Sequence, residues 1–70
     1  MTDMLSITVN GEPRRVDAGS SVADLVESLG IPLTKVAVER NLDIVPRSTL
    51  ADVKLAEGDN LEIVHFVGGG

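Results

Sequence analysis

The sequence contains no cysteine, tryptophan or tyrosine, and its one aromatic residue is Phe66. The lack of cysteine excludes disulfide bonds, thiolate metal sites, iron–sulfur clusters and an internal thiol nucleophile. Basic residues are also scarce, since six Lys and Arg stand against eleven Asp and Glu, which gives a net charge of −5. Such a chain lacks the electrostatic footprint that binds a phosphate backbone, so we predict no binding to nucleic acid.

Long apolar runs and catalytic motifs are missing as well. Ile63-Val64 and Phe66-Val67, separated by His65, are far too short to cross a bilayer. The first residues have no basic segment followed by an apolar one, so we expect a cytoplasmic location and no membrane association. His65 is the only histidine, and without nearby ligands or a placed carboxylate it suggests neither a metal site nor a catalytic role. The absence of hydrolase, P-loop and dinucleotide motifs predicts that the chain is not an enzyme.

Alternating apolar residues predict two strands in the first part of the chain. The first strand runs from Met4 to Asn10 and the second from Glu12 to Asp17. Asn10-Gly11 between them has the preferred chemistry of a tight hairpin turn. Pro13 lacks an N–H, so we expect the second strand at a sheet edge.

A short amphipathic helix is predicted after Gly19. Ser21 precedes Asp24 by three residues, which is the spacing of a capping box. The apolar residues at i, i+3, i+4 and i+7 spacing are Val22, Leu25, Val26 and Leu29. Gly30 can end the helix in a left-handed conformation. A helix this short is not stable alone, so its apolar side must lie against a sheet.

The second half of the chain predicts a short hairpin, one helical turn and a final strand. The hairpin consists of residues 36–39, a turn at 41–43 and a short strand at 44–45 that stops before Pro46. The three-residue spacing from Thr49 to Asp52 indicates one capped helical turn. The final strand is predicted from Asn60 to Val67. One of its faces carries Leu61, Ile63, His65 and Val67, and the other carries Glu62, Val64 and Phe66.

This order of elements predicts an α+β fold, with a mixed sheet of four to five strands and one main helix on one face. Strands that are distant in sequence can pair in parallel through a crossover that carries the helix, so we expect the final strand in the middle of the sheet. We expect one domain over residues 1–67, followed by a flexible glycine tail at 68–70.

The three glycines Gly68, Gly69 and Gly70 allow two interpretations. One is a frayed end of the chain. The other is an arm that threads a narrow channel, because glycine has no Cβ, and that carries its carboxylate about 10 Å from the body at about 3.3–3.6 Å per residue. Ordering that arm costs about 3–6 kcal/mol, at roughly 1–2 kcal/mol per residue, so a partner must also contact the body.

We predict a partner-docking surface at the end of the final strand. It consists of Glu62, Val64, Phe66 and Val67. The alternative is that Phe66 belongs to the core and that Val64 is an isolated exposed apolar residue.

Two stretches carry a family resemblance. They are VAVERN with IVPR in residues 36–47, and EGD leading into EIVHFVGGG in residues 57–70. Together they resemble the ThiS family, the sulfur carrier proteins of thiamine biosynthesis. The resemblance covers essentially the whole chain and implies a ubiquitin-like β-grasp fold.

The resemblance also implies a chemistry for Gly70. An E1-like adenylating enzyme would use MgATP to convert the Gly70 carboxylate to an acyl-adenylate. A persulfide from a cysteine desulfurase or a related sulfurtransferase would displace AMP and leave a thiocarboxylate. Thiazole synthase would then take this sulfur for the thiazole ring of thiamine. Gly68, Gly69 and Gly70 would be threaded into the partners' active sites, and the carrier would be a monomer without a bound cofactor.

Three other functions use a similar domain. The same end chemistry serves molybdopterin synthesis, and a ubiquitin-like modifier would join Gly70 to lysines of its targets. A passive β-grasp binding module would not need the glycines. A terminal Gly-Gly alone does not separate these possibilities.

Overall fold

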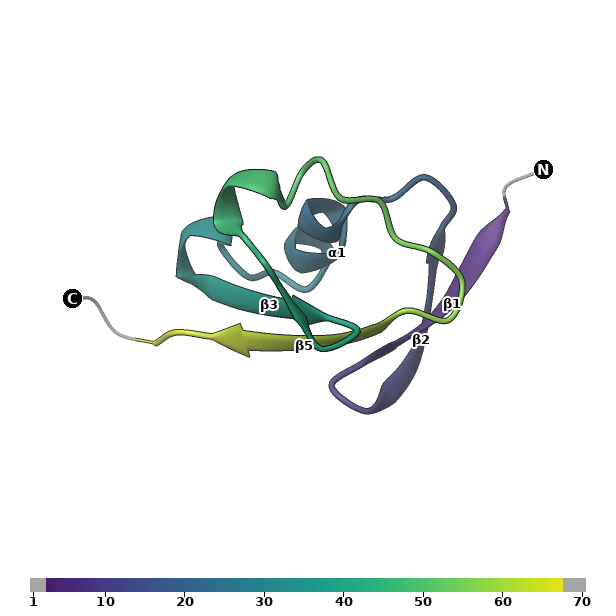
Figure 1. Ribbon diagram of the computed structural model, residues 1–70, viewed down its shortest axis with the longest axis horizontal. Helices are drawn as coiled ribbons and strands as arrows, with labels where there is room; N and C mark the ends of the chain where they lie inside the picture. The colour runs from purple at the N-terminus through teal and green to yellow at the C-terminus, as the bar shows by residue number, and fades with distance from the viewer. Residues whose placement is uncertain (1–2, 68–70) are drawn as a thin grey trace.

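The computed structural model describes residues 3–67 and has one helix packed on a five-stranded mixed sheet in the order β2-β1-β5-β3-β4. The strands are β1 (Met4–Val9), β2 (Glu12–Asp17), β3 (Val36–Arg40), β4 (Asp43–Val45) and β5 (Asn60–His65). The helix is α1 (Val22–Ser28), and two 3-10 turns are η1 (Leu33–Lys35) and η2 (Arg47–Thr49). Figure 1 shows α1 and both 3-10 turns on the same side of β3 and β5. The predicted α+β class and single main helix are confirmed.

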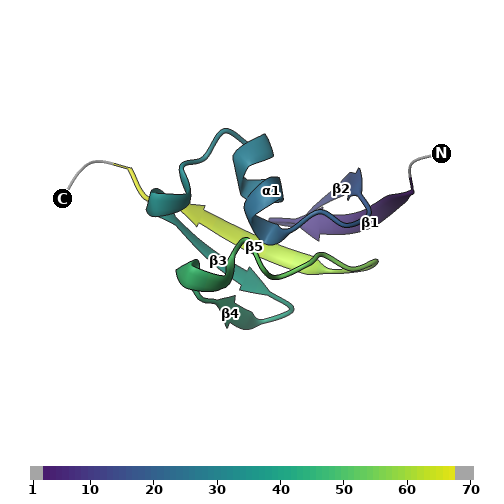
Figure 2. The same cartoon turned by 90° about the horizontal axis from the view of Figure 1, so that it is seen from above.

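The β1–β2 hairpin forms where the sequence predicts it. Asn10 and Gly11 have φ angles of 50° and 84°, the left-handed conformation that a two-residue hairpin turn requires at both positions. β2 pairs only with β1 and lies at the edge of the sheet, so the missing N–H of Pro13 interrupts no central ladder. Figure 2 shows this hairpin at one end of the sheet and β4 at the other.

The capping box at the start of α1 is confirmed in both directions. The Asp24 N–H donates to Ser21 Oγ at 3.0 Å, and the Ser21 N–H donates to Asp24 Oδ2 at 2.9 Å. Val22, Leu25 and Val26 are buried against the sheet. The helix thus begins and faces inward as the spacing of its residues predicts.

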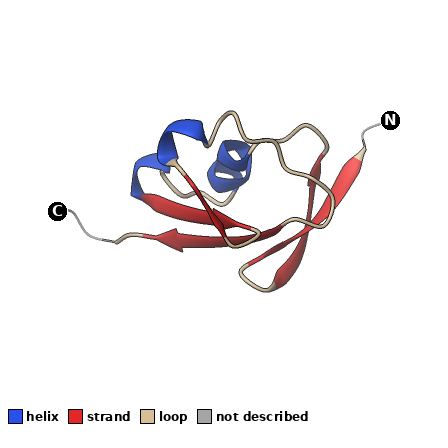
Figure 3. Cartoon of the chain, in the orientation of Figure 1, coloured by secondary structure: helices blue, strands red, loops and turns tan. Residues whose placement is uncertain are grey.

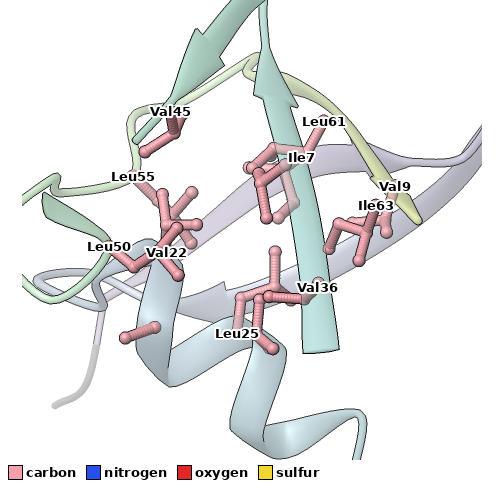
Figure 4. Packing of buried hydrophobic residues seen from close by; sticks show 13 residues of the cluster. Ile7, Val9, Val22, Leu25, Val36, Val45, Leu50, Leu55, Leu61 and Ile63 are labelled. Atoms are coloured by element: carbon pink, nitrogen blue, oxygen red, sulfur yellow. The ribbon is translucent and has the colours of Figure 1, made fainter. Parts of the chain in front are cut away.

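The core lies between α1 and the inner face of the sheet. Figure 4 shows Leu25 of α1 pointing toward Val36 of β3. The buried apolar side chains are Ile7, Val9, Val22, Ala23, Leu25, Val26, Val36, Val38, Val45, Leu50, Leu55, Leu61 and Ile63. All strands except β2 contribute to this set, so the core lies against the centre of the sheet and the β2 edge has no fully buried side chain.

β5 lies in the middle of the sheet, as predicted. It pairs in parallel with β1 through Thr8↔Asn60 and Val9↔Leu61, and antiparallel with β3 from Val36↔His65 to Arg40↔Leu61. The chain between β1 and β5 carries α1, so the parallel pair is closed by a helical crossover.

Several predicted boundaries are wrong, and β1 ends at Val9 rather than Asn10 while β3 ends at Arg40 rather than residue 39. The helical turn is η2 at Arg47–Thr49 rather than a capped turn from Thr49 to Asp52, because the Thr49 hydroxyl donates to the Pro46 carbonyl at 2.9 Å instead of capping the residues after it. Asp43 belongs to β4, because it pairs with Arg40. β5 ends at His65 rather than Val67, because the pairing strand β3 begins at Val36, the partner of His65.

The predicted glycine tail at 68–70 lies outside the described residues, so its flexibility and the boundary at 67 stay predictions. None of the helices in residues 3–67 has the length and apolar character needed to cross a membrane. Figure 3 shows the helical segments gathered over one face of the strands.

Candidate functional site

The candidate site is the C-terminal end of β5 together with the sheet face that α1 leaves open. β5 is held from both sides, although its main-chain pairing with β1 ends at Val9↔Leu61. The side chain of Asn10 continues the contact: its Nδ2 donates to the Ile63 carbonyl at 3.1 Å, and the Ile63 N–H donates to its Oδ1 at 2.8 Å. The Asn10 side chain in the β1–β2 turn therefore makes the two hydrogen bonds that a neighbouring strand would make to Ile63, and it fixes the middle of β5.

The last described residues leave the sheet beyond β5. The Phe66 N–H donates to the Lys35 carbonyl of η1 at 2.9 Å, which is the final backbone hydrogen bond in this direction within residues 3–67. Val67 is 90% exposed. Figure 1 shows β5 running to one end of the molecule, away from the β1–β2 hairpin. The chain is thus held by a backbone hydrogen bond at Phe66 and is exposed at Val67.

The four residues predicted to dock a partner are all exposed. Val64 and Phe66 are 56% and 47% exposed, so Phe66 is not a core residue. Glu62 and Val64 share the sheet face opposite to the buried Leu61 and Ile63, whereas Val67 lies past the strand. The alternative that placed Phe66 in the core is wrong, and the docking role of the four residues stays a prediction.

The structure adds three residues to this face that the sequence did not single out. Ala37 is the cross-strand partner of Val64, Glu39 is the partner of Glu62, and Ile44 of β4 is the partner of Glu39. Together they line one groove with Glu62 and Val64, and Ile44 is 79% exposed. The strands were predicted, but the register that aligns them depends on pairing between distant segments, so the shared face could not be read from the sequence.

A buried carboxylate organises the start of β5. Asp59 is 4% exposed and accepts from Arg40 Nε at 2.8 Å, from the Ala56 N–H at 2.8 Å and from Asn41 Nδ2 at 3.1 Å. Burial opposes ionisation of Asp59, but these hydrogen bonds and the charge of Arg40 outweigh it, so its pKa lies below the ordinary value. The sequence analysis gave Asp59 no role of its own.

Asn41 joins the β3–β4 turn to the same point of β5. The Asn60 N–H donates to Asn41 Oδ1 at 2.9 Å, and the Asn41 N–H donates to the Asn60 carbonyl at 2.8 Å. The next residue, Leu42, has a φ of 73° and is 83% exposed. An apolar side chain in the left-handed region is uncommon, so this turn presents Leu42 to solvent at some conformational cost.

The described part of the chain offers an exposed sheet face but no evident metal site. In residues 3–67 no group of three or more His, Cys, Asp or Glu side chains is arranged to hold a metal ion. His65 is exposed at the end of β5, opposite Val36.

Comparison with known proteins identifies the family. The ThiS family model matches residues 7–70, which is most of the chain. The chain belongs to the ThiS family, the sulfur carrier proteins of thiamine biosynthesis. Members of the ThiS family are carriers rather than catalysts, so the predicted family and carrier role are confirmed.

Full-length ThiS relatives agree in sequence and in structure. The sulfur carrier protein ThiS of Bacillus subtilis is 37% identical over 67 residues, which cover 96% of this chain and 100% of the relative. The crystal structure of the thiamine biosynthesis protein ThiS from Geobacter metallireducens matches with a TM-score of 0.77 and 32% identity, over 94% of this chain and 100% of that one. The β-grasp fold of ThiS is therefore the fold of this chain.

A second type of relative is much longer. The thiazole synthase of Paramagnetospirillum magneticum is 50% identical over 66 residues, which are 94% of this chain but 20% of the relative. The thiazole synthase of Magnetococcus marinus is 47% identical over an equal share. This ThiS-family chain thus spans about a fifth of the length of the thiazole synthases that it matches.

Proposed function

We propose that this chain carries sulfur as a thiocarboxylate on Gly70 and delivers it to the thiazole ring of thiamine. The observation that carries the proposal is the ThiS family match, which continues through the glycines to residue 70. The geometry supports it, because β5 is anchored on both sides and Phe66 and Val67 after the strand are exposed. Gly68, Gly69 and Gly70 would be the segment that enters the partners' active sites.

The proposed chemistry needs activation by another protein. A carboxylate is a poor electrophile, so an E1-like adenylating enzyme joins the Gly70 carboxylate oxygen to the α-phosphorus of MgATP, and pyrophosphate leaves. A persulfide from a cysteine desulfurase or a sulfurtransferase attacks the acyl carbon, and AMP leaves. Two electrons from a thiol then cleave the sulfur–sulfur bond and release the thiocarboxylate. The chain itself binds no cofactor in this scheme.

We propose thiazole synthase as the acceptor of the sulfur. Two relatives that carry this name contain a segment similar to nearly the whole of this chain, at 50% and 47% identity. A thiazole synthase polypeptide with such a segment favours thiazole formation over molybdopterin synthesis as the destination of the sulfur. The cytoplasmic location and the monomeric state expected from the sequence stay predictions.

The docking surface is part of this proposal. Glu62, Val64, Phe66 and Val67 lie beside the point where the glycines begin, and all four are exposed. Contacts there would offset the roughly 3–6 kcal/mol needed to order three glycines, at about 1–2 kcal/mol per residue. A partner could then hold the arm without binding it tightly along its length.

Deletion of Gly70 tests the chemistry. Incubation of the chain with the adenylating enzyme and MgATP should release pyrophosphate, and deletion of Gly70 should abolish the release while the thermal unfolding curve stays unchanged. Addition of one residue after Gly70 is the matched control for length and should also abolish it. Equal pyrophosphate release from the deleted form would reject the proposal.

Intact-mass measurement follows the sulfur. After the complete reaction the carrier should gain the mass of one oxygen-to-sulfur exchange at residue 70, and the gain should disappear when thiazole synthase and its substrates are added. Higher-mass ladders that resist reducing agents would instead indicate a protein modifier. A mass gain that persists with thiazole synthase and disappears with the large subunit of molybdopterin synthase would assign the carrier to that pathway.

A further inference from the structure

We infer that the outer face of β3, β4 and β5 receives a protein surface with an arginine among apolar side chains, and that Glu39 and Glu62 together bind that arginine. The inference rests on the proposed carrier function, because it specifies the chemistry of a partner that docks beside Glu62 and Val64. The residues that carry it are Glu39, Glu62, Ala37, Ile44 and Val64, which line one groove.

The two glutamates form a like-charge pair. Glu39 and Glu62 are direct partners in the antiparallel β3–β5 ladder, so their side chains leave the same face of the sheet side by side. Within residues 3–67 the only ion pair joins Arg40 to Asp59, so no cation of the described chain neutralises either glutamate. Like charges directly opposite each other destabilise a sheet. The free carrier therefore keeps a repulsion that a bound cation would remove.

Apolar residues surround this pair. Ile44 lies opposite Glu39 on the β4 side, and the Ala37–Val64 pair occupies the next outward-facing row of the ladder. Ile44 and Val64 are 79% and 56% exposed. A charged pair framed by apolar side chains is poorly suited to solvent but well suited to an interface, where the apolar rim excludes water from a central polar contact.

Arginine fits this arrangement better than other cations. Its planar guanidinium has five donors in a fixed fork, so one side chain can donate to two neighbouring carboxylates at once. A lysine ammonium is a compact, strongly hydrated charge that lacks this fork. The net charge of −5 also favours a partner with a basic surface, since complementary charge speeds encounter.

Replacement of Glu39 or Glu62 by neutral glutamine tests both parts of the inference, which are the repulsion in the free chain and the arginine contact in the complex. Glu39→Gln and Glu62→Gln should each raise the melting temperature by about 1–5 °C, because they remove the repulsion. The same variants should raise the Kd for the adenylating enzyme or for thiazole synthase by about tenfold or more, because a hydrogen-bonded charge is lost from the interface. Affinity is measured by titration calorimetry with each purified protein, at two salt concentrations.

Glu12→Gln is the matched control, since it changes the net charge equally. Glu12 is exposed on β2 and pairs with Val9, a residue of the core face, so it lies on the opposite side of the sheet. Its Kd values should stay within about twofold of those of the unchanged chain. Kd values for Glu39→Gln and Glu62→Gln that match those of Glu12→Gln with both partner proteins would overturn the inference, and so would an unchanged or lower melting temperature.

Other occupants give distinct results. Concentration-dependent self-association that the two glutamine variants abolish would assign the face to a second copy of this chain and overturn the inference. The pyrophosphate assay with the unchanged chain is independent of these measurements. Its failure would reject the carrier function, whereas normal pyrophosphate release with unaltered Kd values in the variants would reject only the arginine-binding pair.

Discussion

At the scale of single residues, Asp59 makes hydrogen bonds that join separate parts of the chain. Its carboxylate is 4% exposed and binds Arg40, Asn41 and the Ala56 N–H, so it ties the β3–β4 turn to the start of β5. A buried carboxylate with one guanidinium and further hydrogen bonds is stable only while every partner is present. Loss of the Asp59 charge should therefore weaken its contacts with Arg40, Asn41 and the Ala56 N–H together.

We predict that Asp59 gives the protein an acid-sensitive stability. Its pKa is lowered from the ordinary value of 3.8, so its contribution is complete well above that value and is lost as the pH falls through and below it. Asp59→Asn should lower the free energy of unfolding at pH 7 by about 2–3 kcal/mol. Urea unfolding between pH 7 and pH 3 should show a smaller fall in stability for the variant than for the unchanged chain.

The exposed Asp52→Asn is the control for this measurement. It should follow the pH curve of the unchanged chain. Asp24 also has a lowered pKa, caused by its hydrogen bonds to the Ser21 backbone and hydroxyl. Some acid sensitivity should therefore persist in Asp59→Asn, whereas parallel curves for Asp59→Asn and the unchanged chain would contradict the role of Asp59.

At the scale of elements, β5 depends on a side chain to extend its short parallel pairing. The Asn10 amide makes two hydrogen bonds to the Ile63 backbone, at 3.1 and 2.8 Å, where the β1 main chain has already turned away. Asn10 also has a φ of 50°. The same residue thus shapes the hairpin turn and fixes the strand that leads to the proposed carrier end.

We predict that Asn10→Gly destabilises β5 without disturbing the hairpin turn. Glycine adopts a positive φ readily, so the variant removes only the two amide hydrogen bonds and should cost about 1–2 kcal/mol. Amide hydrogen exchange at Ile63 should become faster, because its N–H loses the Asn10 acceptor, whereas the Asn60 N–H still donates to Asn41 and should keep its exchange rate. Asn10→Asp keeps an acceptor for the Ile63 N–H, so its exchange rate at Ile63 should lie between those of the unchanged chain and of Asn10→Gly. Unchanged exchange at Ile63 in the glycine variant would contradict this role.

Local signals in the sequence predicted the elements, and pairing between distant segments decided the rest. The Asn10-Gly11 turn, the Ser21–Asp24 capping box and the edge position of Pro13 each follow from neighbours in the chain, and all three are confirmed. The end of β5 and the Glu39–Glu62 pair depend on the β3–β5 register, which no local pattern determines. The Asp59 cluster was missed because Arg40 is distant in sequence and a turn aspartate needs no partner to be explained.

At the scale of the whole molecule, the two faces of the sheet have different tasks. α1 covers one face, as Figures 1 and 2 show, and the core side chains lie beneath it. The other face presents Ala37, Glu39, Ile44 and Val64 along β3, β4 and β5. The core residues and the residues proposed to bind a partner therefore lie on opposite faces of the sheet. A carrier that meets several enzymes in turn gains from this separation, because changes on the docking face need not affect the fold.

Phe66→Asp tests this separation at the junction of body and arm. Phe66 is 47% exposed and follows β5. An aspartate there should shift the melting temperature by no more than about 4 °C, because surface substitutions usually change stability by less than about 0.5 kcal/mol. Binding to the adenylating enzyme should weaken by about tenfold or more, since an aromatic contact would be replaced by a charge. Ala18→Asp is the control and should bind normally, because Ala18 is exposed beside the start of β1, far from the end of β5. Loss of folding in Phe66→Asp would show that the aromatic ring supports the body, whereas unchanged folding with unchanged affinity would remove Phe66 from the docking surface.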